Sequence, residues 1–380
     1  MSRHYLDHAS TSPLRPEAAR IMIQMTQEGG GGHPGRIYTE GQAARVPIEE
    51  ARDKVAALFK VASRQVIFTS GATESINATT WGAIRANSGG VILCSAAEHS
   101  ACLGSGHNFG SVETIPVDCT GEIDTDYLWK RLRTARSDSD IALLHCQAAN
   151  HEVGTIQPLS QISTIAKEQG VMLHVDAAAS TSTLQMDFAE IGADVVSISG
   201  HKIGGPPGTG AMILRKGLRL EPFITGGSEE RSRRAGMENS IGIAGFGAAA
   251  EALMANRPSE AAFARMQIDT MIDAALQTEA IALLGPADQS KRLANIACFG
   301  ISDVLGEPIV LGMDQAGVAV HSGSACSSES MEPSPVLAAM GLDPDRSLRI
   351  SVGWDTSDSD VEAFCKAFPV VIGKLRALKP

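Results

Sequence analysis

The run VVSISGHK at residues 195–202 places a lysine directly after a short apolar stretch that reads as a buried strand. Its apolar and β-branched residues are too few for a typical helix and suit a strand covered on both faces. Similar runs recur along the chain, and residues of helical period lie between them, as at 48–59 and 159–170. The other strand candidates are VIFTS at 66–70, VILCS at 91–95, IALLHCQ at 141–147, VMLHVD at 171–176 and AMILR at 211–215. This alternation predicts an α/β fold with a mostly parallel sheet covered by helices on both faces.

The pattern changes after the alanine-rich stretch 241–255. A long helix is expected at about residues 259–280 and a C-terminal helix around 359–378, with the short runs IACFGI, VAVHSG and LRISVG between them. The serine-rich stretch 321–334 is predicted to be a mobile loop. We therefore predict two domains, a large one of residues 14–255 and a smaller α+β domain that combines residues 1–13 with 256–380.

Composition and charge argue against several classes of function. The formal net charge is −11, so nucleic-acid binding would need a local basic patch, and the tight cluster Arg231, Arg233 and Arg234 lies beside two glutamates. No run approaches the roughly 20 apolar residues of a membrane span, and the N-terminal residues lack an apolar signal core. The seven cysteines follow no framework spacing, which favours reduced thiols and a cytoplasmic location. We expect neither nucleic acid nor a membrane as a partner.

Lys202 is the first candidate for chemistry. A lysine just past a strand end points into the crevice where α/β sheets bind ligands, and its amine can form a Schiff base with an aldehyde cofactor. Taken alone, it would be an ordinary surface lysine. Asp176 ends the run at 171–176, where a buried carboxylate needs a partner such as a protonated pyridine nitrogen. Capping of the next segment is an alternative role for Asp176.

Two further strand ends carry candidate residues. SGATE at 70–74 opens a helix with small residues, whose free N–H groups could hold a phosphate, although ordinary strand-to-helix turns look similar. His99 follows the run at 91–95 and could stack on a flat cofactor ring and shuttle protons. Cys94, His99 and Cys102 make too weak a ligand set for zinc, so we expect no metal.

Cys326 lies in SGSACSS at 322–328, among small polar residues that bury little apolar surface. Such a segment suits a thiol that must visit a cofactor and then leave it. Arg349, within LRISVG, is a candidate clamp for a substrate carboxylate, although alone it would be an ordinary strand arginine. The cysteines in apolar runs are interpreted as structural, namely Cys94, Cys146 and Cys298.

Taken in order, these segments resemble the cysteine desulfurases, a branch of the class V aminotransferase superfamily of pyridoxal phosphate (PLP) fold type I. The resemblance implies a large domain with a mostly parallel, seven-stranded sheet and a smaller α+β C-terminal domain. SGSAC resembles the subgroup that supplies iron–sulfur cluster assembly and related pathways. The likeness runs nearly end to end and covers YLDHAST at 5–11, FTSGATES at 68–75, EH at 98–99, NHEVG at 150–154, HVDA at 174–177, SGHK at 199–202, GGSEER at 226–231, AGMEN at 235–239, SGSACSS at 322–328 and LRISVG at 348–353.

The resemblance also implies roles for single residues. Lys202 would be the Schiff-base lysine, Asp176 the partner of the pyridine nitrogen, and Cys326 the nucleophile. His99 would stack on the ring and take part in catalysis, and Arg349 would bind the substrate carboxylate. The cofactor phosphate would be held by Ala72, Thr73, Ser199 and His201. The implied enzyme is a homodimer that converts L-cysteine to L-alanine, leaves a persulfide on Cys326 and passes the sulfur to an acceptor protein.

Three positions depart from the family pattern. His151 stands where the family usually has a second asparagine, Ala179 replaces a glutamine that bonds the phenolic oxygen of the cofactor, and Met237 replaces a threonine that reaches the phosphate of the neighbouring subunit. Each of these replacements could remove about 1 kcal/mol of the free energy with which a polar contact binds the cofactor. Our hypothesis is that His151 binds the cofactor and makes the hydrogen bond that Ala179 cannot make.

Other interpretations stay open. A class V transaminase or lyase would need Lys202 and Asp176 but would have no use for Cys326. A degenerate desulfurase-like subunit that only binds a partner is supported by the three departures alone. A nucleotide-binding site at the four glycines 29–32 lacks the strand-to-helix context of a phosphate-binding fingerprint.

Overall fold

The computed structural model describes residues 3–27, 32–87, 89–134, 140–323, 325–327 and 330–378, without the side chains of 325–327 and 330–332. Most of the glycine run considered above, and residues 324, 328 and 329 of the predicted cysteine loop, lie outside the described residues. None of the helices in the described ranges combines the length and the apolar character that a membrane span requires.

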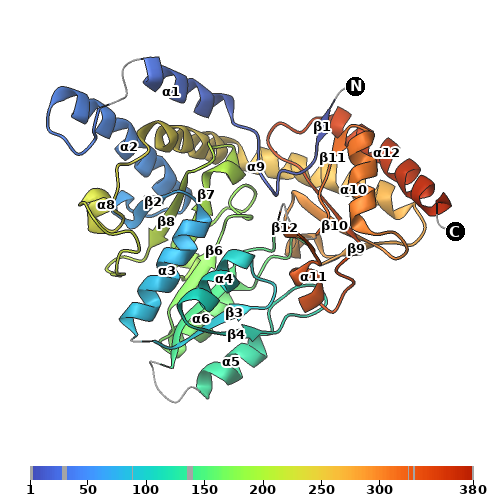
Figure 1. The fold of residues 1–380 in the computed structure, drawn as a ribbon, viewed down its shortest axis with the longest axis horizontal. Helices are drawn as coiled ribbons and strands as arrows, with labels where there is room; N and C mark the ends of the chain where they lie inside the picture. Colours follow the sequence, from blue (N-terminus) through green and yellow to red (C-terminus); the bar gives the residue numbers. More distant parts are fainter. Residues whose placement is uncertain are drawn as a thin grey trace.

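A seven-stranded sheet forms the centre of the larger part of the molecule (Figure 1). Its strand order is β2-β8-β7-β6-β5-β3-β4, and every neighbouring pair is parallel except the two that involve β8. The strands are β2 (Val66–Thr69), β3 (Val91–Ser95), β4 (Ser111–Ile115), β5 (Ile141–Gln147), β6 (Leu173–Asp176), β7 (Val195–Ser199) and β8 (Gly210–Leu214). The predicted α/β fold with a mostly parallel, seven-stranded sheet is confirmed.

β4 is the strand that the apolar runs did not reveal. It lies at the edge of the sheet, and Ile115 is its only fully buried residue. The residues of β5 and β7, by contrast, are all buried. An edge strand that is open to solvent needs no continuous apolar run, so its sequence carries a weaker signal.

Helices cover both faces of the sheet. One face packs against α2, α6 and α9 through a large apolar cluster, whereas α3 and α4 cover the other face through Ile76, Cys102 and neighbouring residues. The helices of this part are α1 (Pro16–Gln27), α2 (Thr39–Leu58), α3 (Ala72–Ala86), α4 (Ser100–Phe109), α5 (Thr125–Arg133), α6 (Leu159–Glu168), α7 (Phe188–Ile191) and α8 (Glu229–Ser232), with the 3-10 turns η1 (Ser63–Gln65) and η2 (Gly200–Ile203). This arrangement buries the sheet and leaves its strand ends open for a site.

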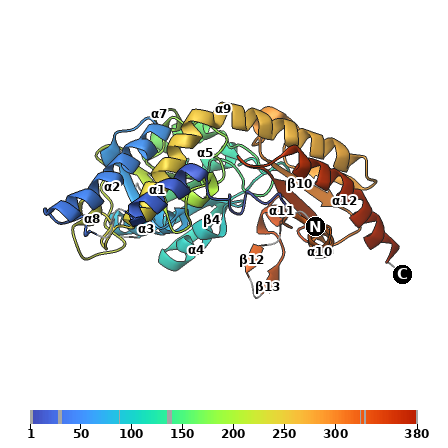
Figure 2. The same cartoon turned by 90° about the horizontal axis from the view of Figure 1, so that it is seen from above.

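A single long helix, α9 (Ser240–Leu276), replaces the alanine-rich stretch and separate helix expected from the sequence. Its N-cap is Asn239, whose side chain accepts the backbone N–H of Gly242, and the helix contains Pro258. The helix expected at about residues 259–280 thus begins earlier and ends earlier than predicted, since α9 runs through Pro258 and packs first on the large sheet and then on the smaller part (Figure 2). The predicted domain boundary at residues 255 and 256 falls inside α9, and the domain division stays a prediction.

The smaller part is built on an antiparallel sheet of order β14-β10-β9. Phe299, Phe364 and Phe368 stack in its core, together with Leu6 from the N-terminal segment. Its elements are β1 (His4–Tyr5), β9 (Ile281–Leu284), η3 (Gln289–Lys291), β10 (Ile296–Ile301), α10 (Gly306–Gln315), β11 (Val318–Ala319), α11 (Pro335–Ala339), β14 (Ser347–Ser351) and α12 (Asp358–Ala377). β1 pairs with β11, so the N-terminal residues belong to this part of the fold.

A short hairpin lies within the stretch predicted to be a mobile loop. It consists of β12 (Ala325–Ser327) and β13 (Ser330–Glu332), in which Cys326 pairs with Met331. Figure 2 shows the hairpin projecting from the side of the molecule opposite α9. Cys326 therefore lies on a projecting hairpin, in the first of its two strands.

Buried histidines are a second feature of the fold. Nδ1 of His145 on β5 lies 2.8 Å from Nδ1 of His174 on β6. Nε2 of His145 contacts the hydroxyl of Thr80 on α3, and Nε2 of His174 contacts the hydroxyl of Ser197. Together with Cys102, these histidines form the only group in the described ranges whose geometry could hold a metal ion. Because hydrogen bonds already engage both ring nitrogens of each histidine, the group reads as a polar network inside the core.

Stability is expected to peak near pH 6.5. Burial lowers the pKa of His145 to about 3 and those of His8, His201 and His321 to about 4, so these rings stay neutral in the folded protein. The unfolded chain binds more protons at them between pH 4 and 6.5, so stability rises with pH there, by roughly 2 kcal/mol per unit. That slope is a net value, because burial raises the pKa of Glu98 to about 8 and that of Glu152 to about 7, so the folded state binds more protons at these carboxyls from about pH 4.5 upward. Their opposite effect offsets part of the histidine slope below pH 6.5 and outweighs it above.

Thermal unfolding of the cofactor-free protein between pH 4.5 and 8 at constant ionic strength measures this dependence. A melting temperature that falls as pH rises from 5 to 6.5 would show that the buried histidines do not control acid stability.

Candidate active site

A pocket of about 430 Å³ opens where β5, β6 and β7 end and where the N-terminal segment and β14 approach them. Thirteen of its lining residues are not among the predicted site residues, among them Ser10, Glu98 and Glu152. The pocket brings together nearly every predicted site residue, namely Ala72, Thr73, His99, His151, Asp176, Ser199, His201, Lys202 and Arg349. Cys326 is the exception, since its side chain is not among those described.

Lys202 lies in η2, directly after β7, and its amine points into this pocket. The Nζ atom donates a hydrogen bond to the backbone carbonyl of Ala9. Burial, and then the positive charge of Arg349, lower the pKa of the Lys202 amine to about 8. A larger unprotonated fraction near neutral pH makes this amine a better nucleophile and base than a surface lysine.

Asp176 and His99 lie at the ends of neighbouring elements. Asp176 ends β6 and accepts a hydrogen bond of 2.9 Å from the backbone N–H of Ala178, while burial raises the pKa of its carboxyl. His99 caps α4, since its Nδ1 accepts the backbone N–H of Ala101 at 3.1 Å. Burial lowers the pKa of His99, and a neutral ring that accepts at Nδ1 carries its proton on Nε2. The ring can therefore donate a proton from Nε2.

The N-terminus of α3 forms the other end of the pocket. The backbone N–H of Ala72 donates to the Oγ of Ser199 at 2.9 Å, which ties α3 to the end of β7. Among the described side chains, His201 has a buried Nε2 without a hydrogen-bond partner. A helix N-terminus beside an unpaired buried imidazole fits an anionic group such as a phosphate.

His151 reaches the pocket from the turn that follows β5. Its ring packs edge-on against the ring of His99, with centroids 5.1 Å apart and planes at 64°. Ala179 also lines the pocket, whereas Met237 is 59% exposed and is not among the lining residues. The ring of His151 thus occupies the neighbourhood that the hypothesis requires, and its hydrogen bond to a cofactor stays a proposal.

Arg349 is fixed on β14 by residues from two distant segments. Its guanidinium donates to the carbonyl of His151 at 2.9 Å, to Oδ1 of Asp7 at 2.8 Å and to Oγ of Ser10 at 2.7 Å. Among the described atoms, its buried Nε has no hydrogen-bond partner. An N–H donor left free beside a held guanidinium suits the binding of a carboxylate.

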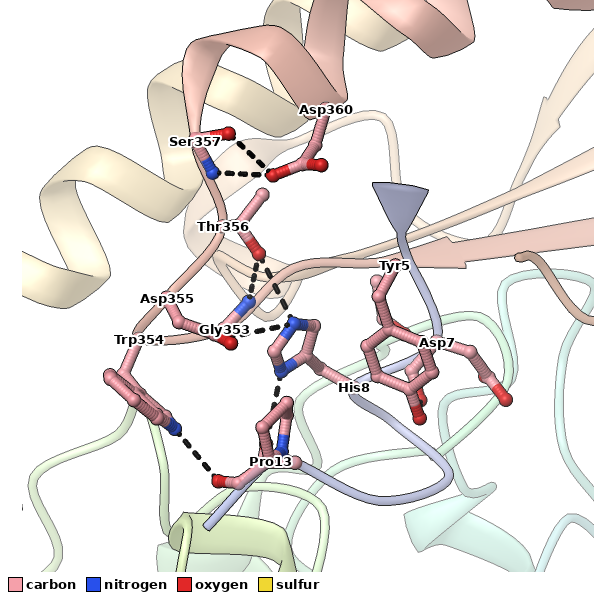
Figure 3. Close-up of polar contacts among 12 residues, drawn as sticks. Tyr5, Asp7, His8, Pro13, Gly353, Trp354, Asp355, Thr356, Ser357 and Asp360 are labelled. Carbon is pink, nitrogen blue, oxygen red and sulfur yellow. Dashed lines mark hydrogen bonds and ion pairs between the residues drawn. The ribbon is translucent and has the colours of Figure 1, made fainter. Parts of the chain in front are cut away.

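The N-terminal segment is held against the smaller part of the fold by His8 (Figure 3). The ring of His8 lies 3.2 Å from Oγ of Ser12 and 3.2 Å from Oγ1 of Thr356. Gly353 is required here, because a Cβ at that position would lie 2.0 Å from the His8 ring. These contacts hold Asp7 and Ala9 beside Arg349 and Lys202.

Sequence reasoning missed the site roles of Asp7, Ala9 and Ser10, and those of two buried acids. Glu98 accepts the backbone N–H of Gln147 at 2.5 Å, and burial together with Asp176 raises its pKa to about 8. Glu152 is 5% exposed and accepts a hydrogen bond from Ser334. The segments that hold these acids, EH and NHEVG, were noticed only as parts of the family pattern.

The fold and the site define a class V aminotransferase, and the model of that family, "Aminotransferase class-V", matches residues 4–364. The chain is 38% identical to cysteine desulfurase IscS 1 of Archaeoglobus fulgidus, over 99% of this chain and 98% of that protein. It is also 38% identical to cysteine desulfurase IscS of Dictyoglomus turgidum, over 99% of this chain and 96% of that one. A solved NifS-like protein superposes with a TM-score of 0.89 at 27% identity, covering 98% of this chain and 100% of the other. Within the class V aminotransferases, the chain belongs to the cysteine desulfurase family.

Proposed function

We propose that this chain converts L-cysteine to L-alanine and receives the released sulfur as a persulfide on Cys326. The observation that carries the proposal is the meeting of Lys202, Asp176, His99 and Arg349 in one pocket. An amine, a buried acid, an imidazole and a guanidinium are the groups that amino-acid chemistry with an aldehyde cofactor needs. Membership of a family whose curated relatives are named cysteine desulfurases supports the same reaction.

Family members depend on PLP, and the residues of the pocket fit this cofactor. Lys202 would hold it covalently, Asp176 would pair with its ring nitrogen, and His99 would lie against its ring. Its phosphate would meet the N-terminus of α3 at Ala72 and Thr73, together with Ser199 and His201, whose buried Nε2 lacks a partner in the described part of the chain. When bound, PLP withdraws electrons from the Cα of the amino acid and so makes its proton acidic.

Residues of the pocket would bind the substrate carboxylate and transfer protons. The substrate carboxylate would accept hydrogen bonds from Arg349, which Asp7 and Ser10 hold in place. Lys202 would move the proton at Cα, because its lowered pKa lets the amine both accept and return a proton near neutral pH. His99, with its proton on Nε2, would act as a second proton donor on the side of the ring.

Cys326 would attack the sulfur of the bound cysteine as a thiolate. A new S–S bond forms while the substrate C–S bond breaks, and the electron pair of that bond stays on the substrate carbon. This carbon takes up a proton and becomes the methyl group of alanine. The persulfide sulfur would pass from Cys326 to an acceptor protein. We also propose that the protein forms a homodimer and is located in the cytoplasm.

Direct mapping of the sulfur tests this function. The purified, PLP-loaded protein is incubated with cysteine, with and without a thiol reductant. With reductant we expect equal amounts of alanine and sulfide; without it, mass spectrometry is expected to find one added sulfur on the peptide that contains Cys326. Mercaptopyruvate in place of alanine would instead indicate a transaminase, and sulfide with pyruvate in place of alanine would indicate a lyase.

A further inference from the structure

The proposed nucleophile lies on the β12–β13 hairpin, and the residues at the two ends of this segment meet at one carboxyl group. On the C-terminal side, Oγ of Ser334 donates to Oε2 of Glu152 at 2.6 Å. On the N-terminal side, Gly323 packs so closely that an added Cβ would lie 2.8 Å from the same oxygen. Glu152 therefore touches both ends of the segment that carries Cys326.

Each end of the segment is fixed by further bonds. The backbone N–H of Gly323 donates to Oγ of Ser347 on β14 at 3.1 Å. Oγ of Ser334 also accepts the N–H of Leu337 at 3.0 Å and so caps α11. A hydroxyl that donates to Glu152 while it accepts from α11 has a fixed orientation, so Glu152 joins the end of the hairpin to a helix and to the pocket.

Glu152 is itself held from the pocket side. Its backbone N–H donates to Oδ1 of Asn150 at 2.8 Å, and its Oε1 lies 3.8 Å from Nε2 of His151. The side chain is 5% exposed and lines the same pocket as Lys202 and Arg349. A buried carboxyl that faces a reactive pocket and also binds the end of a separate hairpin links the two parts of the site.

We propose that Glu152 is a positioning residue for Cys326, which holds both ends of the β12–β13 hairpin so that the thiol approaches the pocket in one geometry. The proposal deepens the proposed function and rests on it only for the identity of the nucleophile. Supporting groups of this kind fix the geometry of reacting atoms, and a misplacement of about 1 Å can cost about 100-fold in rate. Glu152 need not touch the substrate to have this effect.

Two substitutions of Glu152 separate the effect of its hydrogen bond with Ser334 from the effect of its negative charge. Glu152→Ala removes the acceptor for Ser334, and it is expected to slow persulfide formation on Cys326 by about 10- to 100-fold in a single turnover. The KM for cysteine and the visible spectrum of the bound cofactor should stay unchanged. Glu152→Gln keeps an oxygen that can accept from Ser334, so it should restore most of the rate.

The matched control is Glu238→Ala. Glu238 is also 5% exposed, but it pairs with Arg45 on α2 and lies outside the pocket. This variant is expected to lose stability and to form persulfide at the parent rate. If Glu152→Ala and Glu238→Ala slow persulfide formation in proportion to their loss of melting temperature, the role of Glu152 is structural and the proposal is wrong.

Hydrogen–deuterium exchange of the resting protein provides a measurement that needs no turnover. Backbone amides of residues 323–334 should exchange faster in Glu152→Ala than in the parent and in Glu238→Ala. Unchanged exchange overturns the positioning role. Faster exchange in a protein that forms no persulfide on Cys326 supports the positioning role and rejects the proposed function, so the two failures can be told apart.

Discussion

Replacement of Cys326 by serine is expected to lower sulfide release by about three orders of magnitude or more, because a hydroxyl cannot accept the substrate sulfur as a persulfide. The bound cofactor and its visible spectrum should remain, since the predicted cofactor contacts come from the pocket and not from the hairpin. Sulfide and alanine are both measured, with cysteine saturating and a reductant present.

The matched control for this substitution is Cys119→Ser. Cys119 is an exposed cysteine in the turn between β4 and α5, and it does not line the pocket. Its replacement should leave both products unchanged. Turnover that survives in Cys326→Ser would favour a class V transaminase or lyase, and a parent that binds no PLP would favour a degenerate, partner-binding subunit.

Replacement of Lys202 by alanine is the second large effect we expect. Alanine formation should fall by about 10²- to 10⁴-fold, the range for loss of a positioned acid–base group. Lys202 is the only lysine among the described residues that line the pocket, and burial lowers the pKa of its amine to about 8, near the working pH. A substituted pocket therefore has no second amine to take its place.

Covalent attachment is measured separately from turnover. Borohydride reduction of the PLP-loaded parent, followed by peptide mapping, should find the cofactor on Lys202, and the same treatment of Lys202→Ala should find none. Lys216→Ala is the control, because Lys216 is an exposed lysine in the turn after β8. Attachment at another lysine in the parent would contradict the assignment.

The strands and their chemistry could be predicted from sequence because burial leaves a local signal. β5 and β7 are covered on both faces, so their residues form continuous apolar runs. Two charged residues stand out at strand ends, since Asp176 is the last residue of β6 and Lys202 follows β7. β4 and the full length of α9 escaped the same reasoning. The first is an edge strand, and the second contains Pro258, a residue that usually ends or kinks a helix and does not end this one.

Residues that complete the site through distant contacts left no such signal. Asp7 pairs with Arg349, and Glu152 bonds Ser334, across 342 and 182 positions of the chain. Neither pairing follows from spacing or periodicity, because both depend on how the two parts of the fold pack. The orientation of the Cys326 thiol also depends on this packing and cannot be predicted from spacing, and its side chain is not among those described.

The contact between Asp7 and Arg349 also sets an order of events during synthesis. The ribosome makes Asp7 342 residues before its partner, so the carboxylate clamp cannot exist until β14 has emerged. A nascent chain that already holds Lys202 and a finished seven-stranded sheet still lacks β14, and with it the guanidinium that would hold a free amino acid in register. The desulfuration proposed above would therefore have to wait until β14 has been made and has packed against the N-terminal segment.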